Sequence, residues 1–190
     1  GGVREGAYQM LKIAIVGNIA SGKSTVEDFI ELKGYKVYDT DKIAHEILEK
    51  NSKVKEVFNT TDRKEIAKIV FKNKEKLKLL ESIIHPEVKN ELEKIFAINE
   101  KIVFVSVPQL FEAGLNILFD KIIFVNADEN IRKTRLIQRN SLTENEAQVR
   151  IDAQIIGEKM EKSDFVINNN GTIDELNQQV EAILKEILIL

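Results

Sequence analysis

The sequence predicts an α/β fold in which a five-stranded parallel sheet carries helices on both faces. Short apolar runs rich in β-branched residues alternate with stretches that show the 3.6-residue periodicity of helices. Two of the runs, Lys101–Val107 and Lys121–Val125, have the apolar character of strands that are buried inside a parallel sheet. Parallel neighbours need a crossover connection, and the helical stretches between the strands supply it.

The elements behind this prediction follow one another in a regular order. Strands are expected at Leu11–Val16, Tyr35–Tyr38, Lys101–Val107, Lys121–Val125 and Phe165–Ile167. Helices are expected at Ser24–Lys33, Asp41–Lys50, Glu129–Arg139, Thr143–Ile155 and Ile173–Leu190. Gly34 is a typical C-cap residue for the first helix, and Thr143 with Glu146 has the spacing of a capping box.

One long block, from about Ser52 to Phe96, shows helical periodicity and no strand signal. Breaks are expected near Asn59–Asp62 and at His85–Pro86, because turn residues and proline interrupt helices. The block is too long for a simple crossover. It therefore predicts a helical cap beside the sheet, inserted at about residues 52–98.

The length of 190 residues is typical of one domain, which we expect to span residues 10–190. Residues 1–9 fit no predicted element, and the apolar run begins at Met10. We interpret residues 1–9 as an added leader or a disordered segment and Met10 as the natural start.

The composition excludes several classes of site. No cysteine is present, which rules out disulfides, thiolate metal sites and a cysteine nucleophile, and two histidines are too few for a histidine-rich metal cage. With 28 Lys+Arg and 31 Asp+Glu the net charge is −3, which disfavours a broad nucleic-acid surface. No apolar run approaches the ~20 residues of a membrane span, and no signal peptide opens the chain. We expect a cytoplasmic protein.

The most specific pattern in the chain is the loop Gly17–Ser24, with the sequence G-N-I-A-S-G-K-S. It fits G-x-x-x-x-G-K-[ST] between a strand and a helix, a context that disfavours a chance glycine-rich turn. Its backbone N–H groups and the positive end of the following helix are expected to bind phosphate oxygens. Lys23 adds charge at the β- and γ-phosphates, and the Ser24 hydroxyl is expected to reach Mg²⁺. The predicted nucleotide-binding residues here are Gly17, Asn18, Ile19, Ala20, Ser21, Gly22, Lys23, Ser24 and Thr25.

Two features restrict the kind of nucleotide-binding protein. The patterns N-K-x-D and D-x-x-G, which guanine-specific proteins use, do not occur in the sequence. The apolar run Ile102–Val105 continues into Ser106 and not into the aspartate of a Walker B site. Carboxylates for metal binding and proton transfer must therefore come from elsewhere.

Asp39 and Asp41 form an acidic pair directly after the second predicted strand. The carboxyl ends of parallel strands line the ligand crevice, so the pair is expected to face the same region as Lys23. One carboxylate is suited to take a proton from an acceptor hydroxyl and the other, Asp39, to hold Mg²⁺ through water. The alternative is local: Asp41 caps the following helix and Asp39 is a turn residue. The upstream phosphate loop favours the catalytic interpretation.

Several blocks together resemble the dephospho-CoA kinase family. The stretch Val37–Leu48, V-Y-D-T-D-K-I-A-H-E-I-L, is similar to the family's V-I-D-A-D-x-I-A-R-x-V. Ile84-His85-Pro86 is similar to L-H-P, and Val107–Glu112 is similar to V-P-L-L-F-E. The remaining blocks are Gln138-Arg139, Arg150-Ile151 with Gln154, Lys159, Asp164 and Ile167–Gly171. Each block is weak by itself, but together, in the family's order from Leu11 to about Val180, the blocks are specific.

The resemblance implies a P-loop kinase fold of the nucleoside-monophosphate-kinase type, with a helical CoA-binding cap at about 52–98 and a lid at about 132–155. It implies ATP-dependent phosphorylation of the ribose 3′-hydroxyl of dephospho-CoA, the last step of coenzyme A synthesis, with ATP and Mg²⁺ required. The family's usual candidate for the base, the second aspartate of D-x-D, falls on Asp41.

The loop departs from the family's usual T-G-G-I-G-S-G-K-S at three positions. Asn18 and Ala20 replace glycines, and Val16 stands where threonine is usual. The G-x-x-x-x-G-K-S skeleton is intact, so ATP binding is still expected. Any contact of the threonine hydroxyl is lost.

Arg132, Arg135 and Arg139 lie at i, i+3 and i+7 on one face of a predicted helix, where monophosphate kinases carry a lid. Guanidinium groups suit the charge that spreads over a transferring phosphoryl group. We favour Arg139 as the catalytic arginine; a solvated stripe is the alternative. Arg150 and Gln154 share a helix face, and they either close on bound phosphates or brace the lid.

Six further residues are candidates for which a structural explanation has similar weight. His85 is either a substrate contact or a helix-break residue with local hydrogen bonds. Leu110 and Phe111 either contact the adenosine or pantetheine part of the acceptor or pack in the core. Asn169, Asn170 and Gly171 either contact the ATP adenine through backbone groups or form a plain strand-to-helix turn.

Three functions stay open, in order of preference. In a dephospho-CoA kinase, Lys23 and the loop amides hold ATP, Asp41 deprotonates the ribose hydroxyl and Arg139 covers the developing charge. Another small-acceptor P-loop kinase would keep the loop without the D-T-D, H-P and V-P-Q-L-F-E blocks. A nucleotide-dependent regulator would leave the acidic pair without a role. The expected partner is a small molecule, not nucleic acid or a membrane, and the oligomeric state is open, a monomer included.

Overall fold

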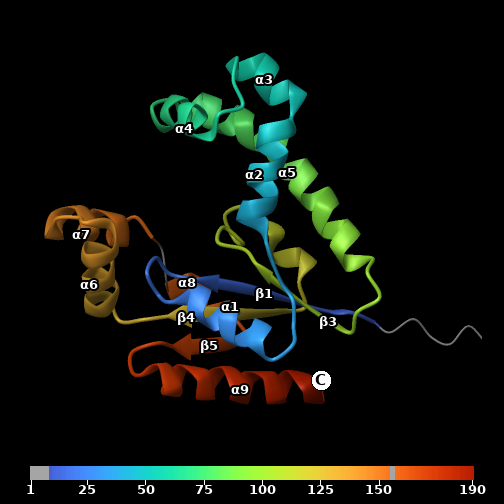
Figure 1. Ribbon diagram of the computed structural model, residues 1–190, viewed down its shortest axis with the longest axis vertical. Helices are drawn as coiled ribbons and strands as arrows, with labels where there is room; N and C mark the ends of the chain where they lie inside the picture. Colours follow the sequence, from blue (N-terminus) through green and yellow to red (C-terminus); the bar gives the residue numbers. More distant parts are fainter. Residues whose placement is uncertain (1–8, 155–156) are drawn as a thin grey trace, which may run out of the picture. The chain divides into compact units, whose positions relative to one another are not determined.

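In the computed structural model, which describes residues 9–154 and 157–190, five strands form one sheet (Figure 1). They are β1 (Leu11–Gly17), β2 (Val37–Asp39), β3 (Ile102–Ser106), β4 (Lys121–Asn126) and β5 (Phe165–Asn168). Their spatial order is β2-β3-β1-β4-β5, and the five parallel strands predicted from the sequence are confirmed.

The central strand β1 pairs with β3 on one side and with β4 on the other. Ile13 stands opposite Phe104 in the first pair and opposite Lys121 in the second. Ile13, Ala14 and Ile15 are completely buried although successive side chains of a strand point to opposite faces. Both faces of the sheet are therefore covered, which explains why the sequence of β1 shows no polar alternation.

The helices alternate with the strands much as the sequence predicts. They are α1 (Lys23–Leu32), α2 (Thr40–Lys50), α3 (Ser52–Phe58), α4 (Arg63–Phe71), α5 (Lys74–Phe96), α6 (Glu129–Asn140), α7 (Glu144–Asp152), α8 (Gly157–Glu161) and α9 (Ile173–Ile189). The helix α8 and a 3₁₀ turn at Leu115–Leu118 had no signal in the sequence. The helix predicted at Thr143–Ile155 ends earlier, since α7 stops at Asp152 and Ala153 caps it. Ile155 itself and residues 1–8 of the predicted leader lie outside the described residues.

The second strand begins later than predicted, at Val37 and not at Tyr35. The Tyr35 N–H still donates to the carbonyl of Ile30, so this residue belongs to the turn that ends α1. Its ring packs edge-on against Phe104, with 5.5 Å between ring centroids. An aromatic residue with high strand propensity is therefore used for packing and not for strand pairing.

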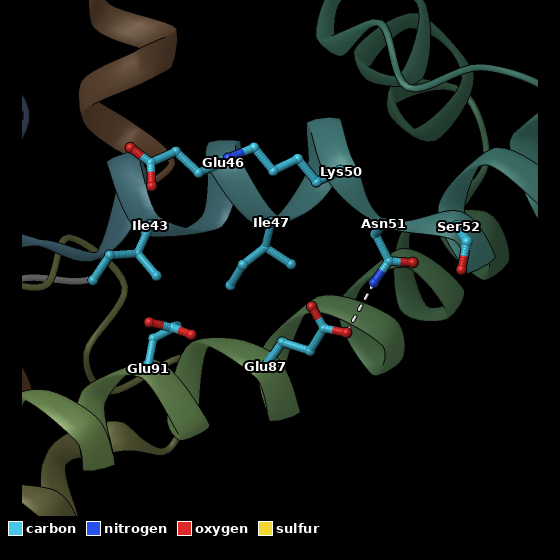
Figure 2. Close-up of a pocket in the computed structure, with 8 residues that line it drawn as sticks. All are labelled: Ile43, Glu46, Ile47, Lys50, Asn51, Ser52, Glu87 and Glu91. Atoms are coloured by element: carbon cyan, nitrogen blue, oxygen red, sulfur yellow. Dashed lines mark hydrogen bonds between the residues drawn. The ribbon is translucent and has the colours of Figure 1, made fainter.

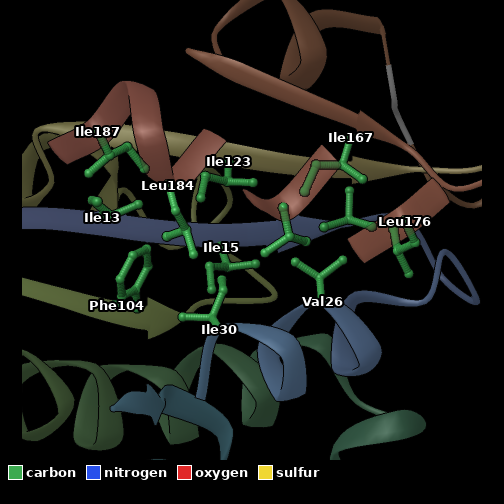
Figure 3. Packing of buried hydrophobic residues seen from close by; sticks show 12 residues of the cluster. Ile13, Ile15, Val26, Ile30, Phe104, Ile123, Ile167, Leu176, Leu184 and Ile187 are labelled. Atoms are coloured by element: carbon green, nitrogen blue, oxygen red, sulfur yellow. The ribbon is translucent and has the colours of Figure 1, made fainter. Parts of the chain in front are cut away.

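The main hydrophobic core lies between the sheet and two helices, α1 and α9 (Figure 3). Ile13 and Ile15 of β1 meet Val26 and Ile30 of α1 there. From α9 the core receives Leu176, Val180, Leu184 and Ile187. The spacing of three or four residues along α9 is the one that keeps side chains on one helix face. This packing fixes the start of α1, and with it the end of the loop Gly17–Ser24.

The chain divides into two compact units, residues 9–38 with 101–190, and residues 39–100. The second unit is helical: α2, α3 and α4 all contact α5 (Figure 1). Its buried side chains include Leu48, Val54, Phe58, Ile66 and Leu92. The unit begins at Asp39, so α2 belongs to it together with the block that the sequence analysis expected to form the cap.

The predicted break at Asn59–Asp62 is confirmed. Asn59 ends α3 in the left-handed conformation, with φ 56°, and the Asp62 side chain caps α4 by accepting from the N–H groups of Lys64 and Glu65. Both residues are common at such positions because a short polar side chain tolerates or satisfies the backbone there.

The predicted break at His85–Pro86 is wrong, because α5 continues through Pro86 to Phe96. Proline inside a helix removes one backbone hydrogen bond and costs about 3 kcal/mol. Ile83, Ile84, Val88 and Leu92 are buried on the same helix, and each contributes about 1.5–3 kcal/mol. Packing on both sides of Pro86 therefore outweighs the local penalty.

The capping prediction at Thr143 is partly confirmed. The Glu146 N–H donates to the Thr143 hydroxyl oxygen over 3.2 Å, and that hydroxyl donates to the Glu146 carboxylate over 2.9 Å. A complete capping box, which was not predicted from the sequence, is found at Thr172 and Glu175 at the start of α9. Within the described ranges, no helix combines the length and the apolar character needed to cross a membrane.

Candidate active site

The loop Gly17–Ser24 joins β1 to α1 and is folded back on itself. The Asn18 N–H donates to the carbonyl of Val125 over 3.2 Å, and the Ser21 N–H donates to the carbonyl of Asn18 over 3.0 Å. Gly22 precedes α1 with φ 89°, a conformation that only glycine adopts readily. N–H groups at the start of a helix in general lack intrahelical acceptors, and in α1 the Thr25 N–H already donates to the Gly22 carbonyl over 3.1 Å. The loop therefore ends at a helix start, a position suited to phosphate oxygens.

A second reason for glycine at position 22 is the contact with Asn169. A Cβ atom on Gly22 would overlap the Asn169 side-chain nitrogen. This nitrogen donates to the carbonyl of Ser21 over 2.9 Å in a buried hydrogen bond. Asn169, which follows β5, thus packs directly on the phosphate-binding loop.

The two unusual residues of the loop have separate consequences. Ala20 has φ 58°, where glycine is relaxed and alanine is strained by about 1 kcal/mol. Asn18 is 6% exposed, and its amide donates to the Asn126 side chain over 2.7 Å; Asn126 in turn donates to Asn168 over 3.2 Å. The polar side chain at position 18 is therefore satisfied by residues at the ends of β4 and β5.

Lys23 is held at the head of the loop by two side chains. Its ammonium donates to Glu27 over 2.8 Å, one helical turn further on, and to the hydroxyl of Ser106 at the end of β3. Ser106 is completely buried and occupies the position where the sequence analysis noted the missing Walker B aspartate. The i, i+4 spacing of Lys23 and Glu27 could have predicted one contact, whereas Ser106 lies 83 residues away and had no sequence signal.

The three arginines of α6 have different surroundings. Arg132 is 3% exposed and donates to the carbonyl of Ala127 over 2.9 Å; burial lowers its pKa, and Glu129 opposes that shift. Arg135 reaches the loop, donating to the carbonyl of Ala20 over 3.0 Å and to that of Asn169 over 3.2 Å. Arg139 is exposed and donates to the side chain of its neighbour Asn140. The predicted role of Arg139 at the transferring phosphoryl group stays a prediction.

Helices α6 and α7 brace the same loop through a small apolar cluster. Leu136, Ala147 and Ile151 are buried together, with Ile19 and Ala20 of the loop packed against them. The Ile19 N–H donates to the Gln154 side chain over 2.8 Å. The Gln154 side chain therefore joins the segment after α7 to the loop Gly17–Ser24, while Arg150 is exposed. Closure of either residue on bound phosphates stays a prediction.

The acidic pair is arranged by a helix cap. Asp39 is the N-cap of α2, and one of its carboxylate oxygens accepts from the N–H of Asp41 over 2.8 Å and from that of Lys42 over 3.4 Å. Asp41 lies in the first turn with an exposed side chain. The capping residue is thus Asp39 and not Asp41, contrary to the local alternative. The proposed convergence of the pair on Lys23 stays a prediction.

The remaining candidates have the following surroundings. His85 is exposed in the middle of α5, so the explanation as a helix-break residue is wrong. Leu110 is completely buried, which favours core packing, and Phe111 is partly exposed beneath the Lys162 ammonium at 5.9 Å. Gly171 leaves space that the Glu175 carboxylate of the α9 capping box occupies, which explains glycine there structurally.

A cavity of about 430 Å³ lies between α2 and α5 in the helical unit (Figure 2). Ile43 and Ile47 of α2 point toward Glu87 and Glu91 of α5 across it. The Asn51 side chain donates to Glu87 over 3.0 Å at one end. The lining combines the apolar Ile43 and Ile47 with the carboxylates of Glu46, Glu87 and Glu91 and the ammonium of Lys50, so its net charge is negative and disfavours phosphate groups.

Among the described residues, no group of three or more Asp, Glu or His side chains could hold a metal ion by itself.

Comparison with known proteins decides the family. The family model described as dephospho-CoA kinase matches residues 11–175. The chain belongs to the dephospho-CoA kinase family. The resemblance noted in the sequence is confirmed, and with it a kinase that uses ATP and the predicted function in the last step of coenzyme A synthesis.

Relatives in this family match over nearly their whole length. The dephospho-CoA kinase of Fusobacterium nucleatum is 39% identical over 188 residues, covering 92% of this chain and 97% of that protein. The dephospho-CoA kinase of Listeria monocytogenes is 37% identical, with 93% and 96% covered.

Solved structures agree with this membership. A dephospho-CoA kinase from Campylobacter jejuni superposes with a TM-score of 0.74 at 32% identity, covering 93% of this chain and 96% of that one. The protein TT1252 from Thermus thermophilus superposes with a TM-score of 0.82 at 33% identity, covering 94% and 98%. A shikimate kinase from Bacteroides thetaiotaomicron, at 18% identity and a TM-score of 0.56, covers 95% and 99% and shares the fold.

Proposed function

We propose that this dephospho-CoA kinase transfers the γ-phosphoryl group of ATP to the ribose 3′-hydroxyl of dephospho-CoA, with Lys23 at the phosphates and Asp41 as the base. The observation that carries the proposal is the loop Gly17–Ser24, whose Lys23 ammonium is held by Glu27 and Ser106 at the start of α1. An ammonium fixed beside a helix start matches the charge of a triphosphate.

On the nucleotide side, the loop amides and Lys23 orient the β- and γ-phosphates. Transfer proceeds in line: the acceptor oxygen forms a bond to the γ-phosphorus as the bond to the β–γ bridging oxygen breaks and ADP leaves. Lys23 neutralises charge on the equatorial oxygens, and Arg139 is proposed to cover them from α6. The backbone groups of Asn169 and Gly171 are proposed to contact the adenine.

Mg²⁺ is proposed to be held by the Ser24 hydroxyl and, through water, by Asp39. The oxygen donors fit this hard cation, and the Ser24 side chain is exposed in the first turn of α1. One Asp39 oxygen caps α2, which leaves the other to accept from a metal-bound water. When bound, the ion screens the phosphate charges so that an alcohol can approach.

On the acceptor side, Asp41 is proposed to orient the 3′-hydroxyl and to accept its proton as the new P–O bond forms. Asp39 N-caps α2, and its bond to the Asp41 N–H fixes the backbone of the first turn, so Asp41 starts from a defined position. His85, Leu110, Phe111 and Arg150 stay proposed substrate contacts.

The cavity between α2 and α5 is proposed to receive the uncharged pantetheine arm. Its glutamates would repel the diphosphate of dephospho-CoA, whereas amide N–H groups can donate to them and methylene groups can pack on Ile43 and Ile47. A cytoplasmic enzyme without nucleic-acid or membrane partners stays the expectation from sequence, and the oligomeric state is open.

The function can be tested by measuring which acceptor stimulates the release of ADP from ATP. ADP release from ATP and Mg²⁺ should be stimulated by dephospho-CoA and much less by AMP, CMP or shikimate. Stimulation by AMP or shikimate alone would favour the alternative of another small-acceptor kinase. Nucleotide binding without stimulation by any acceptor would favour a regulator.

A further inference from the structure

We propose that the Asn169 side chain is a positioning residue for the nucleotide phosphates, because it sets the direction of the peptide bond between Ser21 and Gly22. The inference rests on the assignment of Gly17–Ser24 as the phosphate-binding loop and goes beyond a backbone contact of Asn169 with the adenine. It assigns to the segment after β5 a role in building the phosphate site.

The contact is buried and its polarity is fixed by chemistry. The Asn169 side-chain nitrogen donates to the Ser21 carbonyl over 2.9 Å, and Asn169 is 8% exposed. A carbonyl oxygen only accepts, so the NH₂ end of the amide must face the loop. The main chain of Asn169 is held as well, since its N–H donates to Asn126 over 2.7 Å and its carbonyl accepts from Arg135 over 3.2 Å.

The geometry of the peptide bond turns this contact into control of the phosphate site. In a trans peptide the carbonyl of one residue and the N–H of the next point in opposite directions. When Asn169 holds the Ser21 carbonyl, the Gly22 N–H must point away from Asn169. Arg135 holds the preceding carbonyl, that of Ala20, in the same manner over 3.0 Å.

The Asn169 side chain packs so closely on Gly22 that position 22 has no space for a side chain. A Cβ atom there would overlap the Asn169 side-chain nitrogen, and the φ of 89° independently requires glycine. The Asn169 amide therefore packs on the backbone of Gly22 and restricts rotation of the peptide between Ser21 and Gly22. Loss of the amide would free this peptide to rotate and would misdirect a donor that a phosphate oxygen needs.

The test replaces the donor by an acceptor of almost the same shape. In Asn169→Asp a carboxylate faces the Ser21 carbonyl, and two acceptors repel each other. We expect the dissociation constants of ATP, ADP and inorganic tripolyphosphate to rise together, each at least about tenfold. Tripolyphosphate carries no adenine, so calorimetry with this probe separates positioning of the loop from a contact with the base.

Lowering the pH supplies a readout that a purely structural role would not move. Burial and the nearby carbonyl should raise the pKa of the introduced carboxyl group, and its protonated form can donate to Ser21. The ratio of the Asn169→Asp to the wild-type dissociation constant for tripolyphosphate should therefore shrink as the pH falls from 8 to about 5.

Asn170→Asp is the matched control. It adds the same charge one residue away, on an exposed side chain whose oxygen accepts from the Asp128 N–H over 2.7 Å and would still do so. We expect its affinity for all three ligands to stay within about twofold of wild type. Asn169→Ala removes the donor without adding charge and should weaken the three ligands in parallel by a smaller factor, even if Asn169→Asp fails to fold.

Three outcomes would overturn either the proposal or the loop assignment on which it rests. Loss of ATP affinity with unchanged tripolyphosphate affinity in the Asn169 variants would overturn the proposal in favour of an adenine contact. An equal loss in Asn170→Asp would attribute the effect to charge and would also overturn it. If the wild-type protein bound neither ATP nor tripolyphosphate, the phosphate-loop assignment itself would be wrong, which is a separate failure.

Discussion

The phosphate loop and the acidic pair are held in different ways. The loop is fixed by side chains distant in sequence: Asn126, Arg135, Gln154 and Asn169 reach it across 108 to 148 residues. The acidic pair is fixed by a helix cap whose hydrogen bonds span two and three residues. The nucleotide side thus depends on the assembled sheet unit, whereas Asp39 and Asp41 take their local arrangement from the start of one helix.

The largest expected effect separates chemistry from nucleotide binding. Asp41→Asn should lower turnover by about 10² to 10⁴, because a general base contributes that much, while leaving ATP affinity unchanged. Steady-state rates with calorimetric titration of ATP measure both quantities. Near-normal turnover in this variant would remove Asp41 from the mechanism.

Gly22→Ala should impair nucleotide binding by the loop Gly17–Ser24. The added Cβ overlaps the Asn169 amide and the φ of 89° is strained for alanine, so the loop must deform. Strain of about 1–3 kcal/mol should lower ATP affinity at least about tenfold and lower the melting temperature. Gly114→Ala is the matched control, since Gly114 also has positive φ but has no neighbour within 4 Å of the added atom; it should lower the melting temperature alone.

Asp39→Asn should separate a metal role from a capping role. Asparagine caps helices as well as aspartate, so α2 should keep its stability. Loss of the carboxylate should raise the Mg²⁺ concentration needed for half-maximal rate by about tenfold. An unchanged Mg²⁺ requirement would leave Asp39 with its cap alone.

Gln154→Ala should weaken the contact by which the segment after α7 holds the loop Gly17–Ser24. The lost bond to the Ile19 N–H is worth about 0.5–1.5 kcal/mol, which predicts a two- to tenfold loss of ATP affinity. Arg150→Ala in α7 is an informative partner, because its exposed side chain is a proposed substrate contact that should affect the acceptor and not ATP binding. Equal ATP affinities for Gln154→Ala and wild type would contradict the bracing role.

The smallest effect is expected for Ala20→Gly. Glycine relieves the strain at φ 58°, worth about 1 kcal/mol, but gains freedom in the unfolded chain that offsets about 0.4–1 kcal/mol. The free energy of unfolding should therefore rise by less than about 1 kcal/mol in denaturant titrations. A clear loss of stability would show that the Ala20 methyl group is needed in the cluster with Leu136 and Ile151.

The sequence predicted those features that local patterns determine. The five strands, the phosphate loop and the break at Asn59–Asp62 follow from apolar runs, glycine spacing and turn residues. Tertiary packing overrode local preference at Pro86, which α5 includes, and at Tyr35, which serves the core.

The bracing of the loop was not predictable. Gln154 was a candidate for closing on phosphates or bracing the lid, and its bond to the loop, like the contacts of Ser106 and the Asn169 side-chain amide, forms only after the chain has folded. No periodicity or spacing marks such contacts, because their partners are more than 80 residues apart. The contacts that hold the loop in place therefore had no signal in the sequence.

The most direct test of the whole account is identification of the product. Wild-type protein incubated with ATP, Mg²⁺ and dephospho-CoA should yield coenzyme A, seen by ³¹P NMR as a new phosphomonoester on the ribose 3′-oxygen, and Lys23→Ala should yield far less. Phosphate released only as the free ion, or attached to another position, would contradict it.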